Sequence, residues 1–196
     1  MATHSNQISP HASKQIRNII IGVVIAAIII AVGKYAYDYV SGLRYKEKVE
    51  LCAYHMYDGA ADAEDTCNTI CSVWYNSIWQ EEDSETDKYT KDSNGFFYDD
   101  FNDALDKLYE DETFLETLRG INSNLEKTNE YMRDLQNPPK GCEQLHKAFM
   151  DFYNEYYTLV NLALDPSGNY NSYSSDFSDA DKKSADNYDK LMVFLE

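Results

Sequence analysis

The chain has 196 residues and a formal net charge of −17, with 34 acidic and 17 basic residues. Three of the acids and six of the bases precede Leu51, which leaves 31 acids and 11 bases in the rest of the sequence. A surface of this sign repels a polyanion, so nucleic acid is excluded as a partner.

An uncharged apolar run of sixteen residues, Asn18–Gly33, lies near the start of the sequence. At about 1.5 Å per residue it falls a little short of a hydrocarbon core about 30 Å thick. The flanking residues supply the remaining length, because long basic side chains and tyrosine rings settle at the lipid headgroups. We therefore predict a transmembrane helix with an interfacial flank over residues 17–40, with the lipid bilayer as a partner. The predicted interface residues are Arg17, Lys34, Tyr35, Tyr37 and Tyr39.

The same run also has the features of a removable signal peptide. Lys14 and Arg17 form a basic segment before it, and Ala31-Val32-Gly33 resembles a small-residue cleavage site. Both interpretations place the rest of the chain outside the cytosol.

The charges of the two flanks do not settle the orientation of the run. A count of basic residues slightly favours a cytoplasmic C-terminal part, because Lys34, Arg44, Lys46 and Lys48 follow the run. The acidic composition beyond Leu51 and the presence of all four cysteines there favour export. We predict a single-pass protein of the cell membrane, with a cytoplasmic N-terminal tail over residues 1–16 and an extracytoplasmic domain over residues 41–196.

Helical periodicity dominates the predicted domain. Glycine and proline are scarce, with 8 and 4 residues, and 17 tyrosines and 8 phenylalanines supply core volume. Apolar residues recur at spacings of three and four in several stretches, the second of which Pro138-Pro139 ends. The predicted helices cover residues 41–80, 97–136, 141–164 and 178–195, with Ser178 as the N-cap of the last and a loop over residues 80–94.

These elements predict an all-α fold. The transmembrane helix continues into an elongated antiparallel bundle of three to four helices, because short connections make neighbouring helices antiparallel. Gly59 is the weak point of the first helix, because glycine costs about 1 kcal/mol relative to alanine in a helix. Gly59 also lies in a patch of small residues that another helix could approach closely, so we predict that the helix continues through it.

Several short motifs are scattered through the domain: Gly59-Ala60 with Ala63-Glu64, Val73-Trp74, Asn76, Phe101-Asn102 with Ala104, Leu135 before Pro138-Pro139, and Pro166-Ser167-Gly168. Together they resemble a pattern in uncharacterised small membrane-anchored helical exported proteins of Gram-positive bacteria. The resemblance implies a helical exported domain and no particular activity. The cysteines and the many tyrosines are not part of that pattern.

Four cysteines in an exported domain suggest disulfides. In an antiparallel bundle with the Pro138-Pro139 turn near the membrane, Cys142 lies closer to Cys52 than to the other two, so we favour a Cys52–Cys142 bridge. Cys67 and Cys71 then form the second candidate pair, although their Cβ atoms on one helix are farther apart than the roughly 3.8 Å of a relaxed disulfide. The alternative is that both are small core residues.

No catalytic, cofactor or metal site is predicted. Zinc at Cys52, His55, Cys67 and Cys71 would need the helix to break, because Cys52 and Cys67 are roughly 22 Å apart along a continuous one. Residues 165–176 carry oxygen ligands loosely spaced as in a calcium loop, but Tyr170 stands where that loop requires glycine. Neither His55 nor His146 has a recognisable nucleophile beside it.

The leading functional hypothesis is a non-enzymatic module at the cell surface, which binds an unknown protein or a cell-envelope component or has a structural role. An accessory subunit of a larger membrane complex is the alternative, for which Gly22 and Ala26 give a small-residue pair in the span. A metal-dependent or other enzyme is the third choice.

Overall fold

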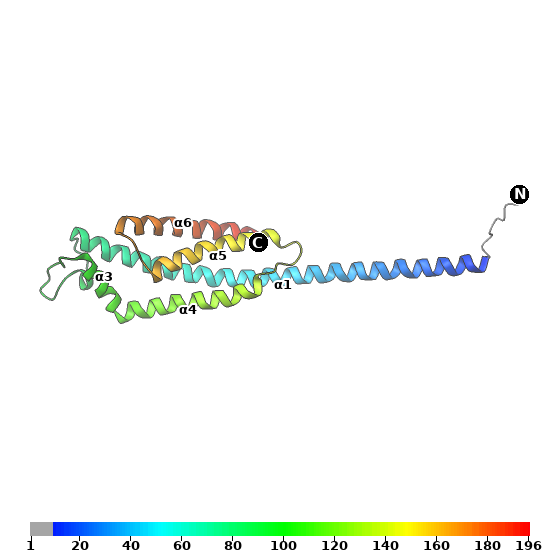
Figure 1. Ribbon diagram of the computed structural model, residues 1–196, viewed down its shortest axis with the longest axis horizontal. Helices are drawn as coiled ribbons and strands as arrows, with labels where there is room; N and C mark the ends of the chain where they lie inside the picture. The colour runs from blue at the N-terminus through cyan, green and yellow to red at the C-terminus, as the bar shows by residue number, and fades with distance from the viewer. Residues whose placement is uncertain (1–9) are drawn as a thin grey trace. The chain divides into compact units, whose positions relative to one another are not determined.

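The computed structural model describes residues 10–196 and is all-α over that range, which confirms the predicted fold class (Figure 1). Residues 1–9 of the predicted tail lie outside the described residues. The chain divides into two compact units, with the boundary between Arg44 and Tyr45. The helices are α1 (Pro10–Trp79), α2 (Asp87–Thr90), α3 (Phe101–Glu110), α4 (Glu112–Leu135), α5 (Glu143–Leu164) and α6 (Tyr170–Leu195).

Among the described residues, α1 is the one helix that is long and apolar enough to cross a membrane. None of its most apolar 18-residue window is buried, and side chains such as Val23 and Ile30 are 64% and 71% exposed. The exposure distinguishes this segment from the core helix of a soluble protein. Its length, composition and position near the N-terminus also fit a signal sequence.

Helix α1 is continuous through Asp58-Gly59, and the close approach of another helix explains the glycine. A Cβ atom at position 59 would overlap the side chain of Asn124 on α4, whose Cγ would lie 2.5 Å away. The Asn124 amide donates to the His55 carbonyl at 3.0 Å and accepts from the Tyr156 hydroxyl at 2.6 Å. Gly59 therefore makes room for a hydrogen-bonded side chain between α1, α4 and α5.

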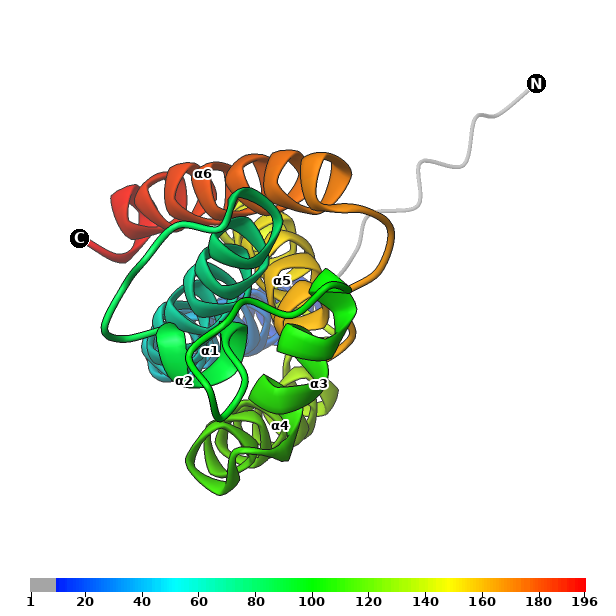
Figure 2. The same cartoon turned by 90° about the vertical axis from the view of Figure 1, so that its left-hand side faces the viewer.

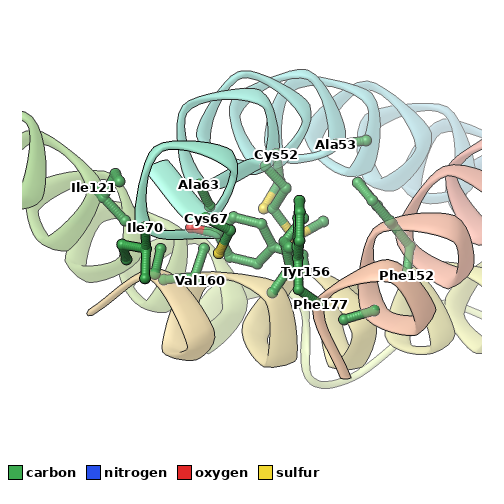
Figure 3. Packing of buried hydrophobic residues seen from close by; sticks show 14 of the residues in the cluster. Cys52, Ala53, Ala63, Cys67, Ile70, Ile121, Phe152, Tyr156, Val160 and Phe177 are labelled. Atoms are coloured by element: carbon green, nitrogen blue, oxygen red, sulfur yellow. The ribbon is translucent and has the colours of Figure 1, made fainter. Parts of the chain in front are cut away.

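Within Tyr45–Glu196, α4 and α6 lie on opposite sides of the pair formed by α5 and the second part of α1 (Figures 1 and 2). Side chains from all four helices build one buried core. Figure 3 shows part of it, including Cys52, Cys67, Tyr156, Val160 and Phe177. The largest fully buried side chains are Tyr156, Tyr173, Phe149, Phe152, Met56, Ile70, Leu108, Ile121, Leu135, Leu159, Leu191 and Val49.

The predicted single helix over residues 97–136 is wrong, because the structure has two helices there. The break is at Asp111, which leaves helical geometry and caps α4 by accepting from the backbone N–H groups of Thr113 and Phe114. A side chain that satisfies two N–H groups at a helix start stabilises a new N-terminus at that residue. The predicted N-terminal end of this segment is also too early, because α3 begins at Phe101 after the cap Asp100.

The last helix begins at Tyr170 and not near Ser178, which lies inside α6. Asn169 is the N-cap, and its side chain accepts from the backbone of Ser172 while the Ser172 hydroxyl accepts from the backbone of Asn169. Because of this reciprocal capping box, α6 begins about two turns before Ser178, in a polar segment that lay between the predicted helices.

The predicted loop over residues 80–94 contains local structure. Its second half forms the short helix α2 and an antiparallel bridge between Lys91 and Phe97. Thr86, just before α2, is buried and accepts a hydrogen bond from the buried Asn76 amide at 2.8 Å. This bond ties the segment to the last turns of α1.

Candidate functional site

An exposed group of aromatic rings lies where α1 ends and α6 begins. The rings of Tyr75 and Trp79 stack at 4.6 Å between centroids with an interplanar angle of 24°. Tyr170 packs edge-on against Trp79 at 5.3 Å and contacts Tyr75 at 5.9 Å. Tyr75 and Trp79 are 40% and 48% exposed. We call these three rings, Tyr75, Trp79 and Tyr170, the Trp79 surface.

Two buried aromatic residues support the Trp79 surface from below. Trp74 is 5% exposed and contacts Tyr170 at 6.3 Å and Tyr173 at 5.9 Å. The Tyr173 hydroxyl donates to the Leu162 carbonyl at 3.1 Å, and burial raises its pKa far above the usual range. The Trp74 indole N–H is buried and has no hydrogen-bond partner among the described residues. Buried polar groups without a partner are uncommon, so this end of the core is unusual.

The electrostatic surroundings of the Trp79 surface are negative. Helix α1 ends at Trp79 with no basic residue in its last turn, and the partial charge at a helix C-terminus is negative. The segment that follows, residues 80–87, contains five carboxylates and no base. The nearest lysines in the chain are occupied, because Lys88 pairs with Asp111 and Lys91 pairs with Glu82 and Asp87.

The two histidines of the domain have structural partners. His55 lies on α1 with its Nε2 atom 3.3 Å from the Asn124 carbonyl, and its ring packs edge-on against Tyr131. His146 on α5 lies with Nδ1 2.7 Å from the Tyr45 hydroxyl, which donates to the Leu135 carbonyl at 3.1 Å. Within the described part of the chain, no group of three or more His, Cys, Asp or Glu residues is arranged to hold a metal ion.

All four cysteines are free thiols in the structure, so neither predicted disulfide is formed there. Cys52 and Cys67 are fully buried, whereas Cys71 and Cys142 are partly exposed. Burial raises the pKa of Cys52 to about 12 and the pKa values of Cys67 and Cys71 to about 11. The protonated form is unreactive, so these three thiols are poor nucleophiles at neutral pH. The pairing of Cys52 with Cys142 and of Cys67 with Cys71 stays a prediction.

The five predicted interface residues are all exposed on α1. Tyr35, Tyr37 and Tyr39 are 76%, 73% and 61% exposed, and Arg17 and Lys34 are exposed at the two ends of the uncharged run. Residues 170–176, part of the rejected calcium loop, are the first turns of α6.

Two hollows lie elsewhere on the second unit. A groove of about 530 Å³ between α5 and α6 is lined by Lys147, Ala148, Lys190, Val193 and Phe194, among others. A smaller hollow of about 80 Å³ lies between α1, α5 and α6. It is lined in part by Glu64 and Asp181, and burial, together with the charge of Asp181, raises the pKa of Glu64.

The Trp79 surface was not predicted from the sequence. Residues 165–177 lay between two predicted helices, so Tyr170 was not placed against α1. The four-residue spacing of Tyr75 and Trp79 was a usable signal, since residues four apart are neighbours on a helix surface. No protein-family model, curated protein or solved structure matches this chain.

Proposed function

We propose that the protein is a single-pass, membrane-anchored module with an extracytoplasmic, non-enzymatic helical domain that binds a partner. The proposal is supported by an apolar segment whose side chains find no cover in the described residues, followed by a folded unit of strongly acidic composition. An acidic domain gains nothing from the anionic inner surface of a membrane, which favours export.

The domain is proposed to be an antiparallel four-helix bundle. The residues of α4 that contact α1 have lower numbers as the numbers on α1 increase, since Tyr45 bonds to Leu135 and His55 bonds to Asn124. The same reversal relates α5 to α6, where Leu162 meets Tyr173 and Phe152 meets Tyr188. A bundle of this kind presents rigid helix faces and one set of loops, which suits recognition more than chemistry.

The observation that carries the binding role is the stacked, half-exposed pair of Tyr75 and Trp79. Large aromatic side chains that remain exposed on a rigid base are typical of the central contacts of protein interfaces. The base here is the third ring, Tyr170, which contacts both members of the pair and packs on the buried Trp74.

The topology is tested with an epitope at the C-terminus of the full chain in intact cells. Antibody and added protease should reach the epitope without permeabilisation, and the chain should stay with membranes after a carbonate wash. An epitope reached only after permeabilisation would contradict export. Full-length protein in the soluble fraction would contradict the anchor.

The binding role is tested by surface cross-linking in the same cells. Trp79→Leu should reduce the yield of the cross-linked species, whereas Tyr157→Leu should not, because Tyr157 is a similarly exposed ring on α5 (43%) outside the Trp79 surface. Equal cross-linking in both variants would contradict a role for the Trp79 surface.

A second candidate function, an accessory subunit that packs through its span, is favoured by Gly22 and Ala26. A Cβ atom at position 22 would have no neighbour within 4 Å, so the backbone is open to close approach by another helix. Gly22→Leu should release a co-purifying membrane protein on gentle detergent extraction if this alternative holds. It should leave surface cross-linking unchanged if the Trp79 surface is the binding site.

A further inference from the structure

We propose that the Trp79 surface recognises cationic side chains, so that its partner is a protein segment bearing exposed arginine or lysine. This inference rests on the proposed partner-binding function and names the chemistry of the ligand. It is carried by three features at the end of α1: exposed electron-rich rings, a carboxylate outside the ion pairs, and the absence of a basic side chain over these rings among the described residues.

The rings are suited to cations. A guanidinium or ammonium group within about 6 Å of an aromatic centroid is attracted by the negative face of the ring, most strongly for tryptophan. The protein uses this contact elsewhere, with Lys88 4.3 Å from the Tyr89 ring and Lys91 4.8 Å from the Phe97 ring. Among the described residues, no basic side chain lies over Tyr75, Trp79 or Tyr170 in this way.

Negative charge at the end of α1 is partly uncompensated. Glu82 and Asp87 share Lys91, but the exposed Glu81 takes part in none of the ion pairs that the described residues form. The helix C-terminus at Trp79 adds partial negative charge. Helix α6 begins nearby with the opposite partial charge, but the Asn169 side chain already binds the backbone N–H of Ser172 there.

Charge complementarity favours a cation over the other ligands that stack on aromatic rings. A neutral oligosaccharide would stack on the rings and donate hydroxyl hydrogen bonds to Glu81, but it would gain no Coulomb attraction, and an anionic polymer would be repelled by a chain of net charge −17. An arginine or lysine side chain would use both the rings and the charge of Glu81, because it can lie over a ring while its charge approaches a carboxylate.

Affinity is measured by isothermal titration calorimetry with full-length protein in a neutral detergent, so that variants without Trp79 are compared by the same method. The three probes are an arginine–glycine repeat peptide, the same peptide with citrulline in place of arginine, and a neutral β-1,4-linked N-acetylglucosamine tetramer. Citrulline keeps the shape of arginine without its charge. Trp79 is one of two tryptophans, so Trp74→Phe leaves it as the sole tryptophan, and selective excitation of tryptophan then reports on the Trp79 surface.

The arginine peptide should change the fluorescence of Trp79 and should bind at least about tenfold more tightly than the citrulline peptide. Trp79→Leu should weaken binding of the arginine peptide by about fivefold, the loss expected for one partly exposed cation–π contact. Glu81→Gln, which alters only an exposed side chain after the helix, should also weaken it, whereas Tyr157→Leu should not.

Equal binding of the arginine and citrulline peptides would overturn the cationic assignment, and so would binding of the arginine peptide that survives both Trp79→Leu and Glu81→Gln. Binding of the neutral tetramer that Trp79→Leu abolishes, with none of the arginine peptide, would overturn this inference and leave the proposed binding function standing. If no probe binds while surface cross-linking still depends on Trp79, the cationic assignment alone fails.

Discussion

Replacing Gly59 with alanine is expected to destabilise the folded unit, although alanine is the better helix former. The methyl group would occupy the place of the Asn124 side chain, which must move and give up its hydrogen bonds to the His55 carbonyl and the Tyr156 hydroxyl. Tyr156 is fully buried, so its hydroxyl would keep only a contact of 3.4 Å with Thr128.

The magnitude follows from these opposing contributions. Two lost hydrogen bonds cost about 2 kcal/mol together, and a buried hydroxyl left without a good partner costs about 1 kcal/mol or more in addition. The gain in helix propensity offsets about 1 kcal/mol. The net expectation is a loss of about 2 kcal/mol in the free energy of unfolding, or about 4–8 °C in Tm for a unit of this size.

Gly120→Ala provides the matched control. Gly120 also lies inside a helix, but a Cβ atom there would meet nothing within 4 Å. This variant should be stabilised by about 1 kcal/mol through propensity alone. Both variants are compared with wild type by thermal unfolding of the full chain in detergent, followed by near-ultraviolet circular dichroism, which reports the aromatic core.

Equal stabilisation by Gly59→Ala and Gly120→Ala would refute the close approach of α4 at Gly59. A double variant, Gly59→Ala with Asn124→Ala, gives a further check. Its loss of stability should be smaller than the sum of the two single losses, because the alanine methyl then enters the space that the asparagine has vacated.

Three further predictions concern a helix cap and two titrating groups. Asn169→Ala should lower the free energy of unfolding by about 1 kcal/mol through loss of the α6 cap. Asn171→Ala is the control, because its exposed side chain makes no hydrogen bond to the described residues and only its carbonyl accepts one. This variant should change the free energy of unfolding by less than about 0.5 kcal/mol in chemical denaturation. The hydrogen-bonded ion pair with Lys88 holds the pKa of Asp111 well below its usual range. The contribution of the Asp111 carboxylate to stability is therefore present above about pH 4 and is lost as the pH falls. The difference in the free energy of unfolding between Asp111→Asn and wild type should shrink in denaturation curves taken from pH 7 to pH 2. Burial raises the pKa of Cys52 to about 12. The contribution of the protonated thiol to stability is therefore complete below about pH 9 and is lost as the pH rises toward 12. Cys52→Ala should lose stability less steeply than wild type between pH 8 and pH 11, and an unchanged slope would contradict a buried thiol.

The all-α class was predictable because the apolar residues repeat at helical spacing and few residues disrupt helices. The break at Asp111 was missed because Leu108 and Leu115 on either side keep a seven-residue spacing, so the stripe continues across the break. Capping chemistry at Asp111 carried the missing information, as did the Asn169–Ser172 pair at the start of α6. Periodicity describes the face of a helix and not where the helix begins.

The candidate site was less predictable than the fold. The Trp79 surface joins residues from the end of α1 and the start of α6, which are about ninety positions apart in the sequence. Only the spacing of Tyr75 and Trp79 is local. The third ring arrives through tertiary packing on Trp74, which also contacts Tyr173, and a single sequence does not encode this packing in any short pattern.

Tyr45, the first residue of the second unit, determines how that unit would respond to mechanical force. Tension transmitted along the chain from its N-terminal side enters the unit at this residue. The phenol is bound to the last residue of α4 through the Leu135 carbonyl and to α5 through His146, so the load is divided between two helices. Peeling α1 from the core from this end would have to break both bonds.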